Sequence, residues 1–341
     1  MPFYKLVSLF LLFCSTSILG LDDDALRQGK FLQNLSEYGF FKDLKNQIPA
    51  QNVLPYQLSS QLFSDYTDKQ RFIYVPNNSK FTFESDKVFQ FPVGTTLIKT
   101  FAYQNVSSSL ETQLLETRLL IHTNDGWEAV GYIWNDDQTD ARLSLVGKTI
   151  QTQFSKDSGE LISVRYRAPN KNQCKECHQL NGVMTPIGPK ARNMDLMVQY
   201  NSGKMNQLEK WAQLGWIDKA LVLNKMVNYF DSSQNMEARA RSYLDINCAH
   251  CHIRGGSADT TGLYLTLEEE NTKHLGFYKK PVATGKGSFN LRYSIVPGKS
   301  EDSILLARMH SLDPGIMMPE SGRALRDEEG LEIVSAWIDS L

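Results

Sequence analysis

The sequence has little net charge and no long basic run. Its 341 residues include 36 lysines and arginines against 38 aspartates and glutamates, for a formal net charge of −2. Because nucleic acids and anionic membrane surfaces attract clustered positive charge, this balance argues against either as a partner. After position 20 the chain also lacks an apolar segment near the roughly 20 residues that a transmembrane helix needs. We expect no nucleic-acid partner and no integral membrane segment in the mature chain.

Common catalytic fingerprints are absent as well. The chain contains no glycine-rich nucleotide-binding motif, no nucleophile elbow and no two-histidine metal motif. It has no solenoid-type repeat, and its 41% hydrophobic and 22% charged residues exclude disorder, collagen and coiled coil. The sequence therefore predicts a folded protein that is long enough for two domains, each with its own core.

Residues 1–20 have the pattern of a secretory signal. A short basic start ends at Lys5, an apolar run spans residues 6–13, and small and polar residues continue to Gly20. A membrane anchor is the alternative, but the apolar run is shorter than a bilayer-spanning helix. We therefore predict a cleaved signal peptide at 1–20 and a periplasmic or otherwise extracytoplasmic mature chain. Four of the five cysteines remain after cleavage.

Residues 21–168 have the pattern of a β-rich domain with a short N-terminal helix. Apolar residues recur at helical spacing within 24–39, and Gly39 stands where a C-cap glycine would. Alternating and β-branched runs follow, and turn-forming residues such as Asn124-Asp125-Gly126 separate them, which favours antiparallel hairpins. We predict an all-β domain that is sandwich-like or barrel-like. The expected strands lie at 71–75, 89–101, 118–123, 130–134 and 161–166.

Helical signals replace the strand signals in the second half of the chain. Apolar residues recur at helical spacing over 205–212 and again over 236–244. Ser300 and Asp327 are expected to cap the two helices that follow. The predicted fold class is therefore α+β and multidomain. Its parts are the β-rich domain at 21–168, a segment at 169–235 and a mostly α-helical domain at 236–341.

The four remaining cysteines lie in two motifs of the form CxxCH, Cys174-Lys-Glu-Cys177-His178 and Cys248-Ala-His-Cys251-His252. Two thiols three positions apart can form thioether bonds to the two vinyl groups of one haem, and the adjacent imidazole can bind its iron. Covalent attachment of this kind takes place after export, in agreement with the signal peptide. We predict two covalently bound haem c groups, with His178 and His252 as iron ligands.

Three other interpretations of the cysteines stay open. Haem could be bound at the second motif alone. The two CxxC pairs could bind one zinc ion through four thiolates, although a zinc ribbon does not need a histidine after each pair. The pairs could also form two local disulfides. In the zinc or disulfide case the chain would be a stabilised binding module rather than a redox protein.

The segment 236–341 resembles a class I c-type cytochrome. A helix leads into Cys248, a second amphipathic helix with Trp337 closes the chain, and Met318 precedes a proline between them. In that family the first and last helices cross, and a methionine supplies the sixth ligand of the iron. The resemblance implies His252 as the proximal ligand and Met318 as the distal ligand.

Other side chains compete for the distal position of this haem. Met317 is the direct competitor of Met318, and Met309 and His310 lie on the preceding helix. Most methionines pack in cores, and that is the ordinary alternative for each of them.

The first motif departs from this family, because a strand and a loop precede it where a helix is expected. The run Ile187-Gly188-Pro189 is similar to the Gly-Pro turn whose carbonyl orients the proximal imidazole in the family. The sixth ligand of this haem stays open among Met194, Met197, a water molecule and an empty position. Met184 is too near His178 in sequence to reach across the ring.

Weaker signals lie elsewhere in the chain. His122 within a strand and His274 after an acidic run are expected to be structural. The segment Phe91-Pro-Val-Gly94, with Lys99 soon after, is similar to part of the cytochrome P460 family, whose haem motif is also CxxCH. No residue role is carried over from that short match.

Together these features predict an exported dihaem c-type cytochrome that transfers electrons. Axial ligands and burial would set the potential of each iron. Its partners would be redox proteins or a small electron donor or acceptor. The alternative in another class is a haem-dependent oxidoreductase, oxidase-like or peroxidase-like, with an open first haem under the β domain.

Overall fold

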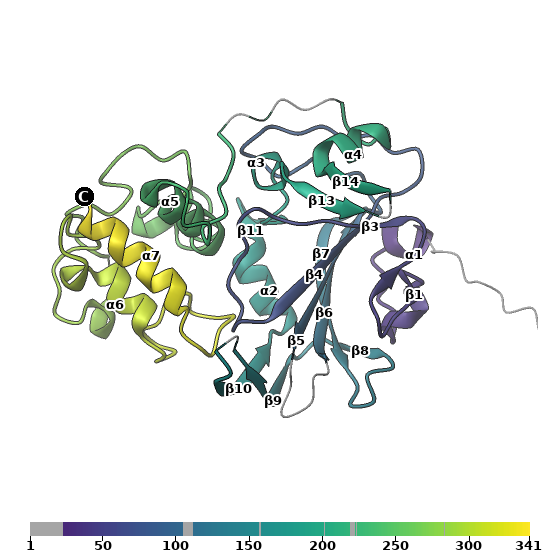
Figure 1. Cartoon of the computed structure of the whole chain (residues 1–341), viewed down its shortest axis with the longest axis horizontal. Helices are drawn as coiled ribbons and strands as arrows, with labels where there is room; N and C mark the ends of the chain where they lie inside the picture. The colour runs from purple at the N-terminus through teal and green to yellow at the C-terminus, as the bar shows by residue number, and fades with distance from the viewer. Residues whose placement is uncertain are drawn as a thin grey trace, which may run out of the picture.

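A computed structural model describes residues 23–104, 112–156, 158–200, 202–218, 222, 224–282 and 284–341. The predicted signal peptide at 1–20 lies outside these residues. The fold is mixed, with several antiparallel sheets and short helices, so the coarse α+β prediction is confirmed. Figure 1 shows a β-rich part and a smaller C-terminal part side by side. None of the described helices has the length and apolar character that a membrane crossing requires.

The β-rich part is built on one six-stranded antiparallel sheet. Its strand order is the sequence order, so each strand pairs with the next along the chain. The predicted hairpin at Asn124-Asp125-Gly126 is confirmed, because Thr123 and Gly126 are paired across it. The strands are β3 (Val53–Pro55), β4 (Asp68–Tyr74), β5 (Thr96–Tyr103), β6 (Gln113–Thr123), β7 (Gly126–Trp134) and β8 (Ala141–Ser144).

The described strands form an open sheet with separate hairpins and not a closed barrel. Strands β3 and β8 are the two edges of the large sheet. The hairpin formed by residues 148–155 and 161–168 contacts the large sheet through side chains. The rings of Tyr103 in the sheet and Phe154 in the hairpin stack with their centroids 4.3 Å apart. The four two-stranded sheets are β1 (Phe41–Asp43) with β2 (Ile48–Pro49), β9 (Lys148–Ser155) with β10 (Leu161–Ala168), β11 (Gln179–Leu180) with β12 (Val183–Met184), and β13 (Met197–Tyr200) with β14 (Gly203–Asn206).

The single helix predicted at 24–39 is wrong. The chain instead forms α1 (Asp23–Arg27) and a 3₁₀ turn, η1 (Leu35–Tyr38). Gly29 adopts a positive φ of 65°, which a continuing helix cannot include, and the chain after it runs extended to pair near Arg142. The expected C-cap is confirmed for the shorter element, since Gly39 is left-handed with φ 67°.

The middle segment packs on the sheet. It contains α2 (Lys171–His178), α3 (Ala191–Met194) and α4 (Gln207–Gln213). Trp211 of α4 is completely buried against an aromatic group that includes Phe81, Phe89 and Phe91. These rings belong to the same core cluster as Leu97 and Leu120 of the sheet. The middle segment therefore shares a hydrophobic core with β5 and β6.

The C-terminal part has three α-helices joined by long loops, so it is less helical than predicted. The expected cap Asp327 is confirmed, because its side chain accepts a hydrogen bond from the Gly330 amide. The expected cap Ser300 is wrong: Ser303 precedes the helix, and Ser300 bonds to Asp339 instead. The helices are α5 (Met236–Asn247), α6 (Ile304–His310) and α7 (Glu328–Asp339), with 3₁₀ turns η2 (Asp259–Thr261), η3 (Gly285–Ser288) and η4 (Ser300–Asp302).

Helices α5 and α7 pack closely where a glycine meets a tyrosine. A Cβ atom on Gly330 would lie 2.4 Å from the Tyr243 hydroxyl oxygen, so only glycine allows this approach. The same hydroxyl donates a hydrogen bond of 3.0 Å to Asp327. Trp337 lies on α7 and is 1% exposed. The first and last helices of this part are thus held at a fixed contact.

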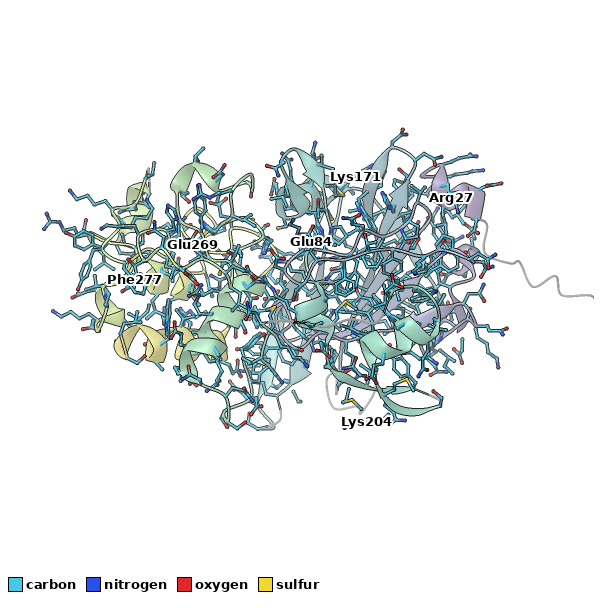
Figure 2. All side chains as sticks on the ribbon, turned by 90° about the horizontal axis from the view of Figure 1, so that it is seen from above. Arg27, Glu84, Lys171, Lys204, Glu269 and Phe277 are labelled. Atoms are coloured by element: carbon cyan, nitrogen blue, oxygen red, sulfur yellow. The ribbon has the colours of Figure 1, made fainter. Side chains whose placement is uncertain are left out.

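Partly buried polar contacts join the two parts. The carboxylate of Asp65, in the loop before β4, accepts hydrogen bonds from the amides of Ala324 and Leu325. The Phe63 amide donates to the Asn247 side chain at 2.7 Å. In Figure 2 the two parts are seen from above, with Phe277 in the C-terminal part and Arg27 at the far end of the β-rich part. A large cavity lies at this junction.

Candidate functional site

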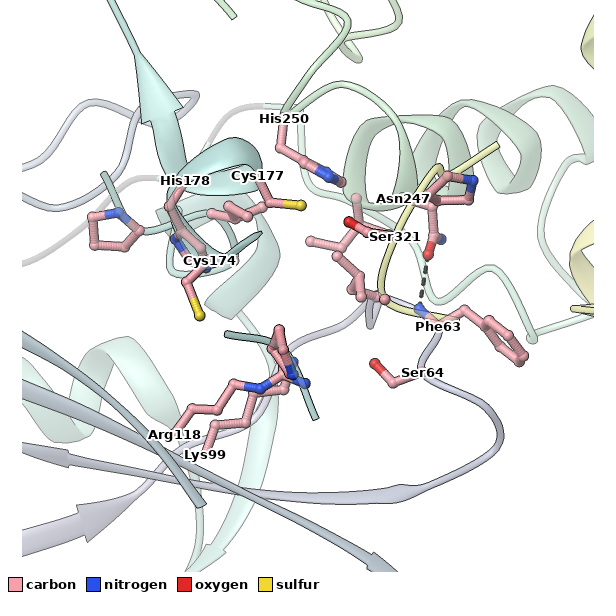
Figure 3. A pocket seen from close by; sticks show the side chains of 18 of the residues that line it. Phe63, Ser64, Lys99, Arg118, Cys174, Cys177, His178, Asn247, His250 and Ser321 are labelled. Carbon is pink, nitrogen blue, oxygen red and sulfur yellow. Dashed lines mark hydrogen bonds between the residues drawn. The ribbon is translucent and has the colours of Figure 1, made fainter. Parts of the chain in front are cut away.

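The junction of the two parts encloses a cavity of about 1530 Å³, including the space at its mouth. One wall is the face of β4–β7, a second is α2, and the third comes from α5 and the loop before α7. Figure 3 shows the side chains that point into it. The first CxxCH motif lies on this cavity in full.

Helix α2 presents the first motif because its start is capped. The Asn170 side chain accepts a hydrogen bond from the Gln173 amide, and the Asn170 amide donates one to the Gln173 side-chain oxygen. Cys174 and Cys177 are three positions apart, so they share one helix face. Both line the cavity together with His178. The four cysteines of the two motifs form no disulfide and are half-buried.

The ring of His178 is oriented by a backbone carbonyl. Its Nδ1 lies 2.9 Å from the carbonyl oxygen of Thr185, which can only accept, so Nδ1 carries the proton and Nε2 keeps a lone pair. Burial lowers the pKa of His178 to about 4, so the ring is neutral at pH 7. The acceptor is Thr185 and not the Gly188-Pro189 turn that the family resemblance implied. Gly188 packs instead against Leu58.

The second motif follows the end of α5. Cys248 is the C-cap residue, and the His252 amide donates 2.9 Å to its carbonyl. The hydroxyl of Thr261 lies 3.5 Å from Nδ1 of His252, and the ring also bonds to the backbone of Leu263. Burial lowers the pKa of His252 as well. His178 is thus held through Nδ1, whereas the ring of His252 is held by the Leu263 backbone, and His252 is not among the described residues that line the cavity.

The two motifs meet in space. The sulfurs of Cys177 and Cys251 and a ring nitrogen of His250 all lie within 4.8 Å of one another. The two thiols share a hydrogen bond, which together with His250 lowers the pKa of Cys251. His250 is a site residue that sequence reasoning missed. It occupies a variable position inside CxxCH, where nothing in the spacing distinguishes it.

The candidate methionine ligands differ in whether they line the cavity. Met318 lines the cavity, as does Met309 from α6. Met317 is 2% exposed and packed away from it. For the first haem, Met194 is buried in the core of the sheet and Met197 is half exposed, so neither reaches the cavity.

The remaining alternatives have other surroundings. His310 is exposed at the end of α6, and Met184 packs against the core of the sheet. His122 bonds to the Phe91 carbonyl at 2.8 Å and stacks on Trp127, as expected for a structural histidine. His274 pairs with Glu269 at 3.2 Å, which is also structural.

Three cations on the sheet wall were not identified from the sequence. Arg71, Lys99 and Arg118 come from β4, β5 and β6 and face the cavity. In Figure 3 the Lys99 and Arg118 side chains run alongside each other toward the space beneath Cys174. The positive charges of Lys99 and Arg118 also contribute to the low pKa of His178, after burial. The only signal in the sequence was the presence of basic residues in otherwise apolar strands.

Comparisons with known proteins give no further guidance. No protein-family model, no curated protein and no solved structure matches the chain. The geometry of this cavity, and of the two motifs that meet beside it, is what indicates a function.

Proposed function

We propose that the chain is an exported dihaem c-type cytochrome that transfers electrons between redox partners. The observation that carries this proposal is the meeting of the two CxxCH motifs. Cys177 and Cys251 come from different parts of the fold, yet their sulfurs lie within 4.8 Å. Two motifs that each bind one haem would in this arrangement hold the two groups at adjacent edges.

The residues present fit covalent haem. Each motif offers two free thiols at the required spacing and an adjacent imidazole, and in His178 Nδ1 is already engaged, which leaves Nε2 for iron. Cys174, Cys177 and His178 would hold one group. Cys248, Cys251 and His252 would hold the other. Met318, the sixth ligand that the family resemblance implies for this second group, lines the same cavity as His178. When bound, each haem supplies an iron that gains and loses one electron.

The chain itself does three things for such a group. The Thr185 carbonyl fixes the tautomer and the plane of the His178 ring. Burial keeps His178 and His252 neutral, which is the form that binds metal. Apolar residues such as Leu97 and Ile246 form part of the cavity lining and would lower the polarity around a redox centre held there. Fixed ligands and partly apolar surroundings suit electron transfer, because little rearrangement of the ligands or solvent accompanies the change of charge.

The test is the ratio of haem to protein. The full-length gene is expressed in a host with the periplasmic haem attachment machinery, and the denatured protein is analysed by its haem absorbance and by intact mass. We expect two haems that stay attached after denaturation. A colourless product from this host would overturn the proposal, and a ratio of one would restrict it to a single motif.

One observation favours a second function. Cys177, His250 and Cys251 form a group of the kind that binds zinc, and tetrahedral sites of three such ligands plus a fourth are common. In that case the metal would tie α2 to the end of α5, and the chain would be a metal-stabilised binding module.

The variant His250→Ala separates the two functions. His250 belongs to the zinc group but is not needed for thioether attachment, so a cytochrome would keep both haems in this variant. A zinc module would lose its metal, which elemental analysis detects. As a matched control, His274→Ala removes an imidazole that lies outside both motifs and leaves either function intact.

A further inference from the structure

Three cations stand in one row across the sheet. In the antiparallel register, Arg71 of β4 is the direct partner of Lys99 of β5, and Lys99 is the direct partner of Arg118 of β6. Residues paired in this way point to the same face of the sheet, which here is the wall of the cavity. Like charges placed directly opposite each other destabilise a sheet.

The row has too few counter-ions within the described residues. Arg118 pairs with the carboxylate of Glu116, which also accepts a hydrogen bond from Tyr166. Arg71 is 5% exposed and bonds only to the neutral oxygens of Gln61 and Lys69, and its Nη2 has no partner.

Lys99 is the least compensated member of the row. Its Nζ lies 4.6 Å from the centroid of the Phe101 ring, with no carboxylate bonded to it among the described residues. Burial lowers the pKa of Lys99 well below its usual value, and the nearby charges of Arg71 and Arg118 lower it further. The middle of the row therefore lacks the negative charge that would make three adjacent cations stable.

A buried charge without a partner is costly, and such groups are normally paired or replaced by apolar residues. On one side the row borders apolar residues, since Leu97 and Leu120, the next pair on the same face, are buried. On the other side the same face carries the charged residues Lys69 and Glu116. Charged side chains that are kept in such a wall and aimed into open space indicate a ligand of opposite charge. Two guanidinium groups beside an ammonium group match the oxygens of a carboxylate or another small oxyanion.

We propose that the row Arg71, Lys99 and Arg118 is an anion site that binds a carboxylate or a similar small oxyanion in the cavity. Two sources can supply this carboxylate or oxyanion. One is a propionate group of the haem held by α2, and this source rests on the proposed function. The other is a free small anion that enters the cavity, and this source does not depend on haem.

The experiment uses the full-length protein as purified, with Lys99→Met and Arg71→Met as the variants. Lys42→Met in β1 is the matched control, because Lys42 is exposed. Reduction potentials are measured by redox titration, and acetate binding is measured by calorimetry. Urea unfolding establishes that each variant is folded.

Each source gives its own result. If a haem propionate occupies the row, Lys99→Met and Arg71→Met lower the potential of one haem while Lys42→Met leaves it unchanged, since a nearby cation favours the reduced and less positive centre. Acetate then does not bind. If the ligand is a free anion, acetate binds the wild type and the control, and Lys99→Met weakens it about tenfold or more.

Two results would overturn the anion site. The first is unchanged potentials in both variants together with no acetate binding. The second is acetate binding that neither substitution weakens. Failure of the proposed function is distinguishable, because a protein without haem leaves the acetate titration as the deciding measurement.

Discussion

The sulfur atoms of Cys177 and Cys251, 74 positions apart in the sequence, lie within 4.8 Å of each other. The contact arises because α2 ends against the turn that follows α5, where the β-rich and C-terminal parts meet. Partly buried hydrogen bonds with the loop before β4 hold both parts at this junction. The relation between the motifs is therefore set by the packing of the whole chain.

From this contact we predict that the two proposed haems interact electrostatically, so that the charge of one changes the reduction potential of the other. The double variant Cys174→Ala/Cys177→Ala should lose one haem, and Cys248→Ala/Cys251→Ala should lose the other. Because the positive charge of one oxidised iron favours the reduced and less positive state of the other, removal of either haem should lower the affinity of the remaining one for its electron. Redox titration of both variants and the wild type measures this shift.

Independent centres would give a different result. The wild-type titration would then equal the sum of the two single-haem titrations. Haem absorbance after denaturation is the control for the number of groups left in each variant.

The neighbouring methionines Met317 and Met318 should differ sharply in effect. Met318 lines the cavity whereas Met317 is buried in the core. Met318→Ala should open one iron to cyanide and lower its potential, because the thioether ligand is lost. Met317→Ala should leave the spectrum unchanged and reduce the free energy of unfolding by about 2–5 kcal/mol through the cavity it creates.

Cyanide titration and urea unfolding of both variants measure this contrast. The assignment of Met318 fails if cyanide binds Met317→Ala and leaves Met318→Ala untouched. Met309→Ala is a useful third variant, since Met309 also lines the cavity.

Local signals were predictable from the sequence where a residue acts on its own backbone neighbours. Asn124-Asp125-Gly126 makes the predicted hairpin, and Asp327 caps the last helix. The prediction that Ser300 caps α6 was wrong because two serines, at 300 and 303, lie close to the start of this helix, and only packing selects between them. The helix expected at 24–39 failed because an apolar spacing of three to four residues says nothing of the left-handed Gly29 within it.

Of the residues that line the cavity, the sequence singled out those of the first CxxCH motif and Met318. The CxxCH spacing identifies Cys174, Cys177 and His178 without any knowledge of the fold. The row of Arg71, Lys99 and Arg118 was not predictable, because it depends on the register of three strands. A shift of one residue in either pairing would turn a member of the row to the other face.

The contact between Gly330 and Tyr243 should be sensitive to one methyl group. In Gly330→Ala the new Cβ would meet the Tyr243 hydroxyl at 2.4 Å, so α5 and α7 have to move apart. We expect a loss of about 1–3 kcal/mol in the free energy of unfolding. Gly131→Ala in β7 is the matched control, because its Cβ would have no neighbour closer than 3.8 Å, and its unfolding free energy should change by less than about 0.5 kcal/mol.

Urea unfolding at constant pH decides between the two glycines. Equal losses in both variants would contradict the close approach of α5 and α7. A loss confined to Gly330→Ala would also be accompanied by a change in the fluorescence of Trp337, which lies on α7.

The ion pair between Arg192 and Asp245 should stabilise the junction in a pH-dependent way. Asp245 is buried, and although burial alone would raise its pKa, the charges of Lys190 and Arg192 bring it below 3.8. A carboxyl with a depressed folded pKa contributes stability that is fully present above its unfolded pKa of about 3.9 and is lost as the pH falls through the folded value. The contribution should therefore be complete at pH 7 and should decline below about pH 4.

The variant Asp245→Asn tests this at the level of unfolding. At pH 7 it should cost about 3 kcal/mol, because it leaves the buried Arg192 with one fewer partner. The gap from wild type should narrow at pH 3, where the wild-type carboxyl also begins to be protonated. Asp218→Asn is the matched control: its pair with Lys80 is exposed, with the Asp218 side chain 84% accessible, so its cost should stay below about 1 kcal/mol at every pH. A buried charge pair differs from an exposed one because its charges have lost their water, so removing one partner leaves the other unpaired. If Asp245→Asn costs as little as this control, or costs the same at pH 7 and pH 3, the ion pair does not hold the two parts together.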